Sequence, residues 1–527
     1  MMKAGQLAIL LAATAGMAAA GSARIAGVVV DSESGAPLAH VRVLLAPEER
    51  LNNERFVFTD AAGRFAFDIA DGHYRLMTEV QGARQNFGER VPGTGLGCSI
   101  IAGPGLDTAN LVFRRYALGA IGGRVVDEAG EPVEAALVQL LRYMVMAGRK
   151  RVVTAQWAWT NDLGEYRFGP LPAGAYFLAV SGHPWYTQEG VRARVGANPS
   201  ELPRRVAFVP QYFPNTTDPT RAGAIVLNPG GEARADFALT PTPAVALRVH
   251  CEGLEGTQKL VSLIRDGIRG TEAFERQQHV NGDVEFHVPP GHYLVRATAT
   301  SANTDYSASQ PIDAEGGETE VRLTLRQVPA VAGVVEFPEG VPRPSSTMLV
   351  HAIREDNGRT FGTVVHADGS FLFPSLPAGK YRVTATATGY LSTGFRAEGA
   401  EQKGEVVDLS EETNARLRVF ASIQVGRLKG FVMNGERAVA GVMVVLAPKE
   451  AADLMEYRGF QTDSDGSFDY QNVRAGEYLL FAVDQPGLEY TNREAIRPFL
   501  AGARGIIIGP GTAGTERIPL AGTGGAP

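Results

Sequence analysis

One short stretch recurs five times along this chain and constrains its fold more than any other feature. The clearest copy runs from Asp368 to Tyr381 and reads DGSFLFPSLPAGKY. Its Asp-Gly pair predicts a tight turn, because glycine accepts a positive φ and aspartate hydrogen-bonds its own backbone. Phe371 and Phe373 are two residues apart, so both face one side of a strand. Leu-Pro-Ala-Gly then reverses the chain, and Tyr381 opens the next strand.

Every copy has the same three fixed positions. Two glycines stand 9 or 10 residues apart, and a tyrosine follows two residues after the second glycine. These predicted turn residues are Gly63, Gly72 and Tyr74; Gly164, Gly174 and Tyr176; Gly282, Gly291 and Tyr293; Gly369, Gly379 and Tyr381; and Gly466, Gly476 and Tyr478. The steps between successive tyrosines are 102, 117, 88 and 97 residues. A unit of about 100 residues is too long for a solenoid repeat and suits an independent domain. The spacing therefore predicts five related domains.

Each unit also opens with an apolar strand that usually carries a glycine. Examples are IAGVVV at 25–30 and IGGRVV at 121–126, whereas the third unit, VALRV at 245–249, has no glycine there. A turn and further short alternating strands follow, about seven in each unit, with turn signals roughly every 8–12 residues. This pattern predicts an all-β chain of about five seven-stranded β-sandwiches in tandem.

Four motifs together point to a known module. They are a strand with Gly-Xaa-Val, a Gly-Xaa-Pro turn, Thr-Asp-Xaa-Xaa-Gly-Xaa-Phe/Tyr-Xaa-Phe, and Leu-Pro-Ala-Gly-Xaa-Tyr. In combination they resemble the carboxypeptidase regulatory-like domain, a prealbumin-like (transthyretin-like) sandwich similar to starch-binding-like folds and common in secreted bacterial proteins. The second and fourth units match well, and the third is the most divergent. The resemblance implies the fold but little about function, because this module accompanies enzymes, transporters and adhesins alike.

The motifs set the expected domain boundaries. The segments are a signal peptide at 1–23, a sandwich at 24–115, a sandwich with an aromatic insertion at 116–241, a divergent sandwich at 242–327, a sandwich at 328–419, a sandwich with short helical insertions at 420–520, and a disordered tail at 521–527. The signal is predicted from Lys3, a short apolar run at 7–13 and small residues before the cleavage point. No later run approaches the ~20 apolar residues that a membrane-spanning helix needs, so the mature chain is expected to have no transmembrane segment.

Aromatic residues of the second unit are the candidate ligand-binding residues. All three tryptophans lie there: Trp157 and Trp159 alternate on one strand, and Trp185 lies in a loop. The full candidate set is Trp157, Trp159, Trp185, Tyr186, Tyr212 and Phe213. Exposed aromatic rings can stack on the apolar faces of sugars, but the same rings can instead pack the insertion onto its own domain, because aromatic side chains bury much apolar area. The sequence leaves both alternatives open.

Other features exclude several kinds of function. The net charge of −7 argues against a nucleic-acid partner, which favours a basic face. Histidines gather in the third unit beside Cys251, but they lack the short paired spacing of zinc sites; they are His250, His279, His287 and His292. The run DSDG at 463–466 resembles the start of a calcium loop, yet the twelfth position is Arg474 instead of glutamate. No nucleophile elbow, His-Glu-Xaa-Xaa-His pair or P-loop is present. We therefore expect no metal, no cofactor and no catalytic residues.

These observations favour an exported, non-enzymatic, multi-domain β-sandwich protein that acts as a scaffold or binding protein of the bacterial cell envelope or extracellular space. The candidate partners are a polysaccharide or an envelope protein, and the expected location is periplasmic or extracellular. The first alternative is a carbohydrate-binding protein that uses the aromatics of the second unit. The second alternative is a hydrolase whose site the sequence does not reveal.

Overall fold

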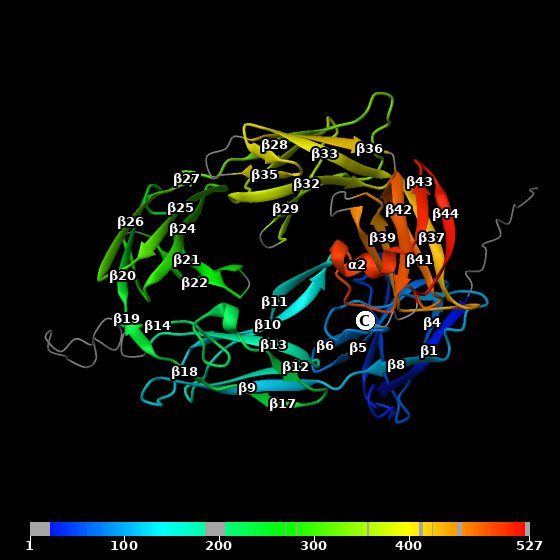
Figure 1. Cartoon of the computed structure of the whole chain (residues 1–527), viewed down its shortest axis with the longest axis horizontal. Coiled ribbons are helices and arrows are strands. Elements are labelled where there is room, and N and C mark those ends of the chain that lie inside the picture. The colour runs from blue at the N-terminus through cyan, green and yellow to red at the C-terminus, as the bar shows by residue number, and fades with distance from the viewer. Residues whose placement is uncertain are drawn as a thin grey trace, which may run out of the picture. The chain divides into compact units, whose positions relative to one another are not determined.

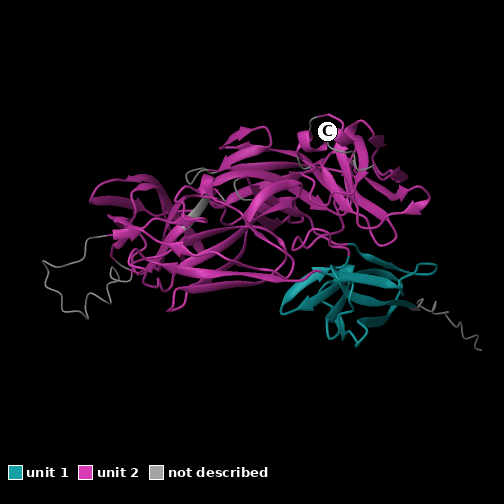
Figure 2. Ribbon diagram, turned by 60° about the horizontal axis from the view of Figure 1, so that its bottom comes forward, with its two compact units in different colours: residues 1–87, 98–115 teal, residues 88–97, 116–527 magenta. Residues whose placement is uncertain are grey.

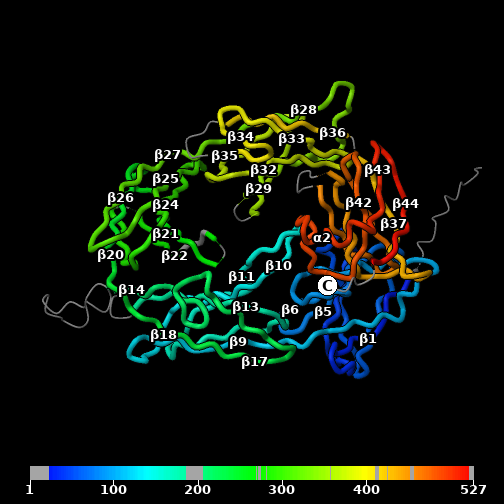
Figure 3. The backbone as a smooth tube through the Cα atoms, viewed as in Figure 1, coloured from blue at the N-terminus to red at the C-terminus, as the bar shows by residue number. Residues whose placement is uncertain are grey.

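Nearly all regular elements of the chain are β-strands, as its computed structural model shows (Figure 1). The structure describes residues 22–184, 206–268, 270–280, 282–355, 358–409, 415–423, 425–450 and 456–521; the tube in Figure 3 draws the others in grey. Most of the predicted signal peptide and most of the predicted tail thus lie outside the described residues, while Ser22 and Ala23 already belong to the first strand. The chain divides into two compact units, 1–87 with 98–115 and 88–97 with 116–527 (Figure 2). The all-β prediction is confirmed.

The first sandwich lies in the first of these units. Its strands are β1 (Ser22–Asp31), β2 (Arg42–Pro47), β3 (Arg55–Phe58), β4 (Arg64–Ala70), β5 (Gly72–Val80), β6 (Ala83–Asn86), β7 (Ile100–Ala102) and β8 (Leu111–Arg115). One sheet has the order β4-β1-β8, and the other has the order β3-β2-β5-β6 with β7 also paired to β5. Ile25 and Phe65 of the first sheet meet Val43 and Leu76 of the second in one buried core. The described residues form eight strands, one more than expected, because β6 and β7 divide one edge of β5 between them.

The second sandwich carries the longest insertion. Its strands are β9 (Gly119–Val126), β10 (Leu137–Met146), β11 (Arg149–Trp159), β12 (Glu165–Leu171), β13 (Gly174–Ser181), β14 (Val206–Phe208), β15 (Gln211–Tyr212), β16 (Ile225–Leu227), β17 (Glu232–Arg234), β18 (Phe237–Ala238) and β19 (Pro241–Pro243). The large sheet has the order β11-β10-β13-β15, with β16 also on β13; the small sheet has the order β12-β9-β17, with β18 also on β9. Between the sheets lie Ile121, Leu140, Phe168 and Leu178. The strand β19 pairs with β14, so the predicted boundary after residue 241 falls inside a strand.

The third sandwich keeps the two-sheet arrangement despite its divergent sequence. Its strands are β20 (Val245–Glu252), β21 (Lys259–Gly267), β22 (Gly270–His279), β23 (Val284–Val288), β24 (Gly291–Ser301), β25 (Thr304–Ala314), β26 (Glu318–Thr324) and β27 (Arg326–Gln327). The sheets have the orders β23-β20-β26 and β22-β21-β24-β25-β27.

The fourth sandwich differs in having one continuous sheet. Its strands are β28 (Val331–Glu336), β29 (Leu349–Arg354), β30 (Thr360–Val364), β31 (Ser370–Phe373), β32 (Gly379–Ala387), β33 (Tyr390–Glu398), β34 (Glu401–Lys403), β35 (Val406–Leu409) and β36 (Arg416–Ser422). The order is β30-β29-β32-β33-β36-β28-β31. The sheet is continuous because β33 pairs with β32 on one side and with β36 on the other, so a single sheet surrounds the core.

The fifth sandwich again has two sheets. Its strands are β37 (Val425–Asn434), β38 (Arg437–Ala438), β39 (Met443–Pro448), β40 (Arg458–Gln461), β41 (Ser467–Arg474), β42 (Gly476–Val483), β43 (Arg504–Ile508) and β44 (Ala513–Pro519). The orders are β38-β37-β41, with β44 also on β37, and β40-β39-β42-β43. Of the short helical insertions expected in this sandwich, the one at 492–500 contains the helix α2 (Arg493–Leu500), where Asn492 caps the backbone N–H of Glu494 at 3.1 Å. Most of the other, at 450–457, lies outside the described residues.

All five sandwiches share the topology around their first strand. In each, the strand that follows the turn of the first motif glycine pairs antiparallel with the first strand, and a strand near the end of the sandwich (β8, β18, β26, β36 or β44) pairs parallel with its other edge. The first strands are β1, β9, β20, β28 and β37. The repeat seen in the sequence is therefore a repeat of topology. In the part of the chain that the structure describes, no helix is long and apolar enough to cross a membrane.

The first glycine of each copy makes the predicted turn. All five adopt a left-handed φ between 72° and 90°, which favours glycine because it has no Cβ. In four sandwiches the glycine carbonyl also accepts a hydrogen bond of 2.8–3.0 Å from a valine N–H of the first strand; these valines are Val29, Val125, Val335 and Val432. A Cβ on Gly164 would lie 2.3 Å from the Val125 carbonyl oxygen. At Gly282 of the third sandwich, by contrast, a Cβ would meet no atom within 4 Å.

The glycine in the first strand leaves room for a close neighbour, which is an aromatic ring at Gly333 and the Leu111 carbonyl of the parallel strand at Gly27. In four sandwiches this glycine lies directly opposite the first aromatic residue of the turn motif; the pairs are Gly27 with Phe65, Gly123 with Tyr166, Gly333 with Phe371 and Gly430 with Phe468. A Cβ on Gly333 would lie 2.1 Å from Cζ of Phe371, so the glycine leaves the space that the ring fills. The third sandwich places the buried Leu247 opposite Phe286 instead.

The tyrosine of each copy ties the second turn to its own strand. Its hydroxyl donates to the carbonyl four residues earlier, over 2.7–2.9 Å for Tyr74, Tyr176, Tyr293 and Tyr478, and Tyr381 makes the same bond. A buried phenol needs such a partner, because an unpaired polar group inside a protein is costly. The conserved spacing of glycine and tyrosine along the repeats thus has a structural role in every sandwich.

Candidate functional site

The edge strand β11 of the second sandwich displays two tryptophans on its outer face. Trp157 lies opposite Gln139 of β10, and Trp159 lies opposite Leu137. Their side chains are 63% and 57% exposed, respectively. Ala158, between them, points the other way and packs against the core. The alternation of a β-strand therefore puts both rings on the same side of the sheet, with no strand beyond them in the sheet order.

A row of residues runs from Trp157 across the whole sheet. Gln139 lies opposite Ala179 of β13, and Ala179 lies opposite Tyr212 of β15. Tyr212 is on the outer face with Trp157, but it is only 2% exposed. It clusters there with Leu141 and Ala179; partly buried side chains around them are Val152, Phe177, Ala222 and Ile268. Because its ring is covered, Tyr212 offers no surface on which a sugar could stack, and we leave it out of the proposed surface.

The other candidate residues fall into two groups. Phe213 is partly buried and packs against the core between the two sheets. Its position fits the alternative in which the insertion packs onto its own domain. Trp185 and Tyr186 lie outside the described residues. Among the six candidates, the structure therefore brings Trp157 and Trp159 together as one exposed pair.

Tyr143 extends this outer face and was not among the residues expected from the sequence. It is 47% exposed and lies opposite Val152 of β11. Its ring meets Phe177 edge-on, with centroids 5.4 Å apart, and Nζ of Lys150 lies 4.6 Å from the Tyr143 centroid. The signal that could have found it is the alternation of β10, which puts residues 137, 139, 141 and 143 on one face. Tyr143 and Lys150 add a polar and cationic margin to the aromatic face.

The histidines of the third sandwich do not assemble into a metal centre. Nδ1 of His250 lies 2.6 Å from Oδ1 of Asp283, and burial lowers the pKa of His279. Across the ranges that the structure describes, no three His, Cys, Asp or Glu side chains are placed to hold a metal ion. Asp465, in the run that resembles a calcium loop, accepts a hydrogen bond of 2.9 Å from the Ser467 N–H, as a turn aspartate does.

A cavity of about 540 Å³ is lined by residues of the fourth and fifth sandwiches. Two carboxylates line it, and both are paired with arginines: Glu456 with Arg474, and Glu405 with Arg382 at 4.0 Å. A hydrolase of the two-carboxylate type needs one carboxyl group as a proton donor and the other as a base or nucleophile. The arrangement therefore suits structural ion pairs better than acid–base work.

Two segments of the chain match a family model, that of the carboxypeptidase regulatory-like domain. The matched residues are 120–204 and 330–419. The resemblance is confirmed in both segments. They correspond to most of the second sandwich, including Trp157 and Trp159, and to the fourth sandwich. A comparison with curated proteins found no match.

Several solved structures of bacterial proteins, pilus proteins among them, align with the chain at low similarity. The Bacillus anthracis TIE protein is 12% identical, over 76% of this chain and 67% of that protein, with a TM-score of 0.16. BcpA, the major pilin subunit of Bacillus cereus, is 10% identical, over 76% of this chain and 99% of that one, with a TM-score of 0.14. The RrgB pilus protein from Streptococcus pneumoniae is 8% identical, over 70% and 91%, with a TM-score of 0.13. At these TM-scores the alignments carry no argument about this chain.

Proposed function

We propose that the chain is an exported, non-catalytic β-sandwich scaffold that binds polysaccharide through the outer face of β11 in its second sandwich. The observation that carries the proposal is the exposed pair Trp157 and Trp159, two residues apart on one face of an edge strand. Exposed tryptophans are costly to keep in water, since burial of a large aromatic ring is strongly favourable. Two such rings side by side therefore favour a binding role.

The spacing of the two rings suits a chain of sugars. Residues two apart in a strand are separated by about 6.5–7 Å along it, so each ring can stack on a different sugar unit of one polysaccharide. The amide of Gln139, which lies opposite Trp157, can hydrogen-bond to a sugar hydroxyl beside the stacked face, and the hydroxyl of Tyr143 can do so four residues further along the same face of β10. The strand is paired with β10 along its length, with one irregularity between Leu140 and Leu141, so the rings are presented on a regular element of the sheet.

The non-catalytic role is supported by what the repeated polar residues do. Oδ1 of Asn161 accepts two backbone N–H groups of its turn at 2.8–3.0 Å, and Asp60 does the same at 2.9 Å. Thr59 and Thr160 each accept one backbone N–H and donate to one carbonyl, inside the sandwich. These groups are therefore occupied in holding turns. Export is supported by the predicted signal at residues 1–23.

Trp157→Ala is expected to weaken polysaccharide binding about tenfold, which corresponds to ~1.4 kcal/mol, because one stacked ring is lost. Affinity electrophoresis in gels containing amylopectin, xylan, pectin or a mixed-linkage glucan measures this, with circular dichroism to check the fold. Val226→Ala is the matched control, because Val226 is a 71% exposed apolar residue of the same sandwich. Wild-type affinity in Trp157→Ala and in the double variant Trp157→Ala/Trp159→Ala would contradict the proposed surface. Retention by none of the polysaccharides would contradict carbohydrate binding itself, and protein partners would then be sought.

A further inference from the structure

The first sandwich carries an aromatic pair at the same place as the second. The sequence FVFTD at 56–60 corresponds to WAWTN at 157–161. Thr59 accepts the Val41 N–H and donates to the Leu38 carbonyl; Thr160 does the same with Ala136 and Val133. Since the threonines make equivalent bonds, the preceding residues are equivalent too, and Phe56 and Phe58 stand where Trp157 and Trp159 stand in the second sandwich.

Phe56 and Phe58 are also displayed in the same way. They belong to β3, which is the edge strand of its sheet, as β11 is in the second sandwich. Their side chains are 52% and 59% exposed. The rings lie edge to face with centroids 5.9 Å apart, and the guanidinium carbon of Arg42 lies 4.4 Å from the centroid of Phe56. The arginine therefore holds one ring in place from the neighbouring strand.

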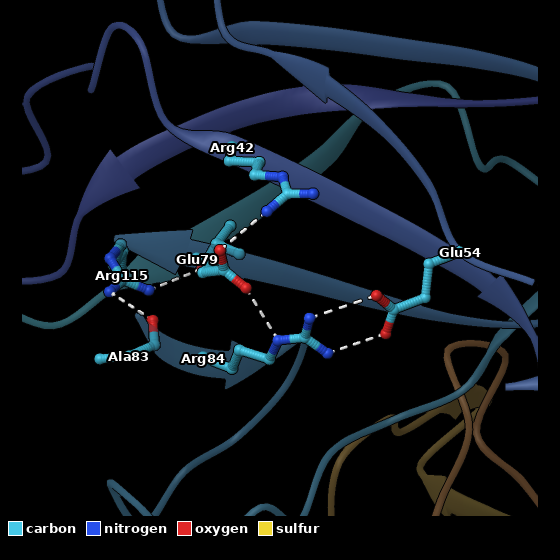
Figure 4. A network of polar contacts seen from close by, with 7 residues as sticks. Arg42, Glu54, Glu79, Ala83, Arg84 and Arg115 are labelled. Atoms are coloured by element: carbon cyan, nitrogen blue, oxygen red, sulfur yellow. Dashed lines mark hydrogen bonds and ion pairs between the residues drawn. The ribbon is translucent and has the colours of Figure 1, made fainter. Parts of the chain in front are cut away.

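A row of charged groups continues from this pair across the sheet. Phe58 lies opposite Arg42 on β2, Arg42 opposite Glu79 on β5, and Glu79 opposite Arg84 on β6. Figure 4 shows the resulting network: Glu79 accepts from Arg42 and from Nε of Arg84, both at 2.9 Å, and Arg84 also binds Glu54 at 2.8 and 3.2 Å. The hydrogen bond from Arg84, followed by that from Arg42, lowers the pKa of Glu79. The row thus presents fixed guanidinium donors and ionised carboxylate acceptors beside two exposed rings.

We infer that the outer face of β3 is a second polysaccharide-binding surface, formed by Phe56, Phe58 and Arg42. The inference rests on the proposed function of β11, because the ligand is taken to be the same polysaccharide. The rings supply stacking surfaces, and the planar guanidinium and carboxylate groups supply the donors and acceptors that sugar hydroxyls need. An acidic or basic macromolecule is a poorer fit, because the charges in the row are paired with one another.

The other three sandwiches lack this pair. The residue in the register position of Trp157 is Arg276 in the third sandwich, Gly362 in the fourth and Gly459 in the fifth. The position of Trp159 is held by Gln278, Val364 and Gln461, respectively. None of these six residues has an aromatic side chain, so these positions offer no pair of rings on which sugars could stack. The inference therefore gives two binding surfaces for each chain.

Isothermal titration calorimetry of the full chain with maltohexaose, xylohexaose and cellohexaose tests this number. We expect two sites for each chain with the hexasaccharide that binds. The double variants Phe56→Ala/Phe58→Ala and Trp157→Ala/Trp159→Ala should each retain one site, and the variant with all four changes should retain none. Val112→Ala is the control in the first sandwich, because Val112 is exposed on the opposite sheet, and it should keep two sites.

The two proposals fail in different ways in this experiment. One site for each chain, lost in Trp157→Ala/Trp159→Ala and kept in Phe56→Ala/Phe58→Ala, would overturn the inference and leave the proposed function standing. No binding of any hexasaccharide, or binding that neither double variant alters, would overturn both. Circular dichroism of each variant separates a lost site from a lost fold, and the half-exposed positions of Phe56 and Phe58 make unfolding unexpected.

Discussion

Gly333→Val is expected to destabilise the fourth sandwich by about 3 kcal/mol or more, because overpacking a core typically costs ~1–3 kcal/mol and more when backbone must move. A Cβ at Gly333 would lie 2.1 Å from Cζ of Phe371 and 2.6 Å from the carbonyl oxygen of Leu417. The ring of Phe371 on β31 and the backbone of β36 at Leu417 would have to shift together. Pulse proteolysis in urea, read by mass spectrometry of peptides from residues 331–409, measures the loss in this sandwich alone.

Gly362→Val is the matched control for this change. Gly362 lies on the edge strand β30, and a Cβ there would meet its nearest atom, Nδ1 of His351, at 3.6 Å, which is an ordinary contact. Valine also favours strands over glycine, so the control should leave the free energy of unfolding within about 0.5 kcal/mol or raise it. If the two variants unfolded at the same urea concentration, the close packing around Gly333 would not be the reason that glycine stands at this position of the repeat.

Alkaline unfolding is the second large effect that we expect. Burial raises the pKa of Tyr293 to about 12, from an ordinary value of 10.0, while its hydroxyl donates to the Pro289 carbonyl. The unfolded chain loses this proton near pH 10, but the folded chain keeps it until near pH 12. Between those values the unfolded state binds fewer protons, so stability is full below pH 10 and falls as pH rises, by up to ~1.4 kcal/mol per pH unit.

Tyr293→Phe isolates that contribution in the third sandwich. The variant loses one hydrogen bond at neutral pH but no longer titrates, so its free energy of unfolding should fall less steeply above pH 10. Urea unfolding followed at several pH values by proteolysis of the third sandwich measures both slopes. Tyr478 of the fifth sandwich, whose pKa burial also raises to about 12, stays in place as an internal comparison. If the free energy of unfolding fell equally steeply with pH in the variant and in the wild type, ionisation of Tyr293 would not be coupled to unfolding.

The turns and tyrosines could be predicted from the sequence because their interactions are local. An Asp or Asn that accepts N–H groups two and four residues on, a glycine with positive φ and a tyrosine that bonds four residues back all lie within one short stretch. The pairing of Gly333 with Phe371 was not predictable in the same way. Both residues stood out in the sequence, but their contact depends on the register between two strands.

The candidate site was predictable only in part, for the same reason. Strand alternation placed Trp157 and Trp159 on one face, and the structure has them there. The burial of Tyr212 depends on Ala222 and Ile268, which no local pattern connects to it. The Phe56 and Phe58 pair, in contrast, had a sequence signal: an aromatic residue, one apolar residue, a second aromatic residue and threonine before the turn, as in the second unit. The same pattern therefore occurs twice in the chain, with tryptophan in the second sandwich and phenylalanine in the first.

Tryptophan fluorescence tests polysaccharide binding at Trp157 and Trp159, because all three tryptophans of the chain lie in the second repeat and two of them form the proposed surface. A saturating concentration of the polysaccharide that retains the chain is added, and emission and quenching by acrylamide are measured. We expect a shift to shorter wavelength and weaker quenching, since stacking removes exposed indole rings from water. Unchanged emission and quenching with polysaccharide bound would place the binding elsewhere and contradict a binding surface at Trp157 and Trp159.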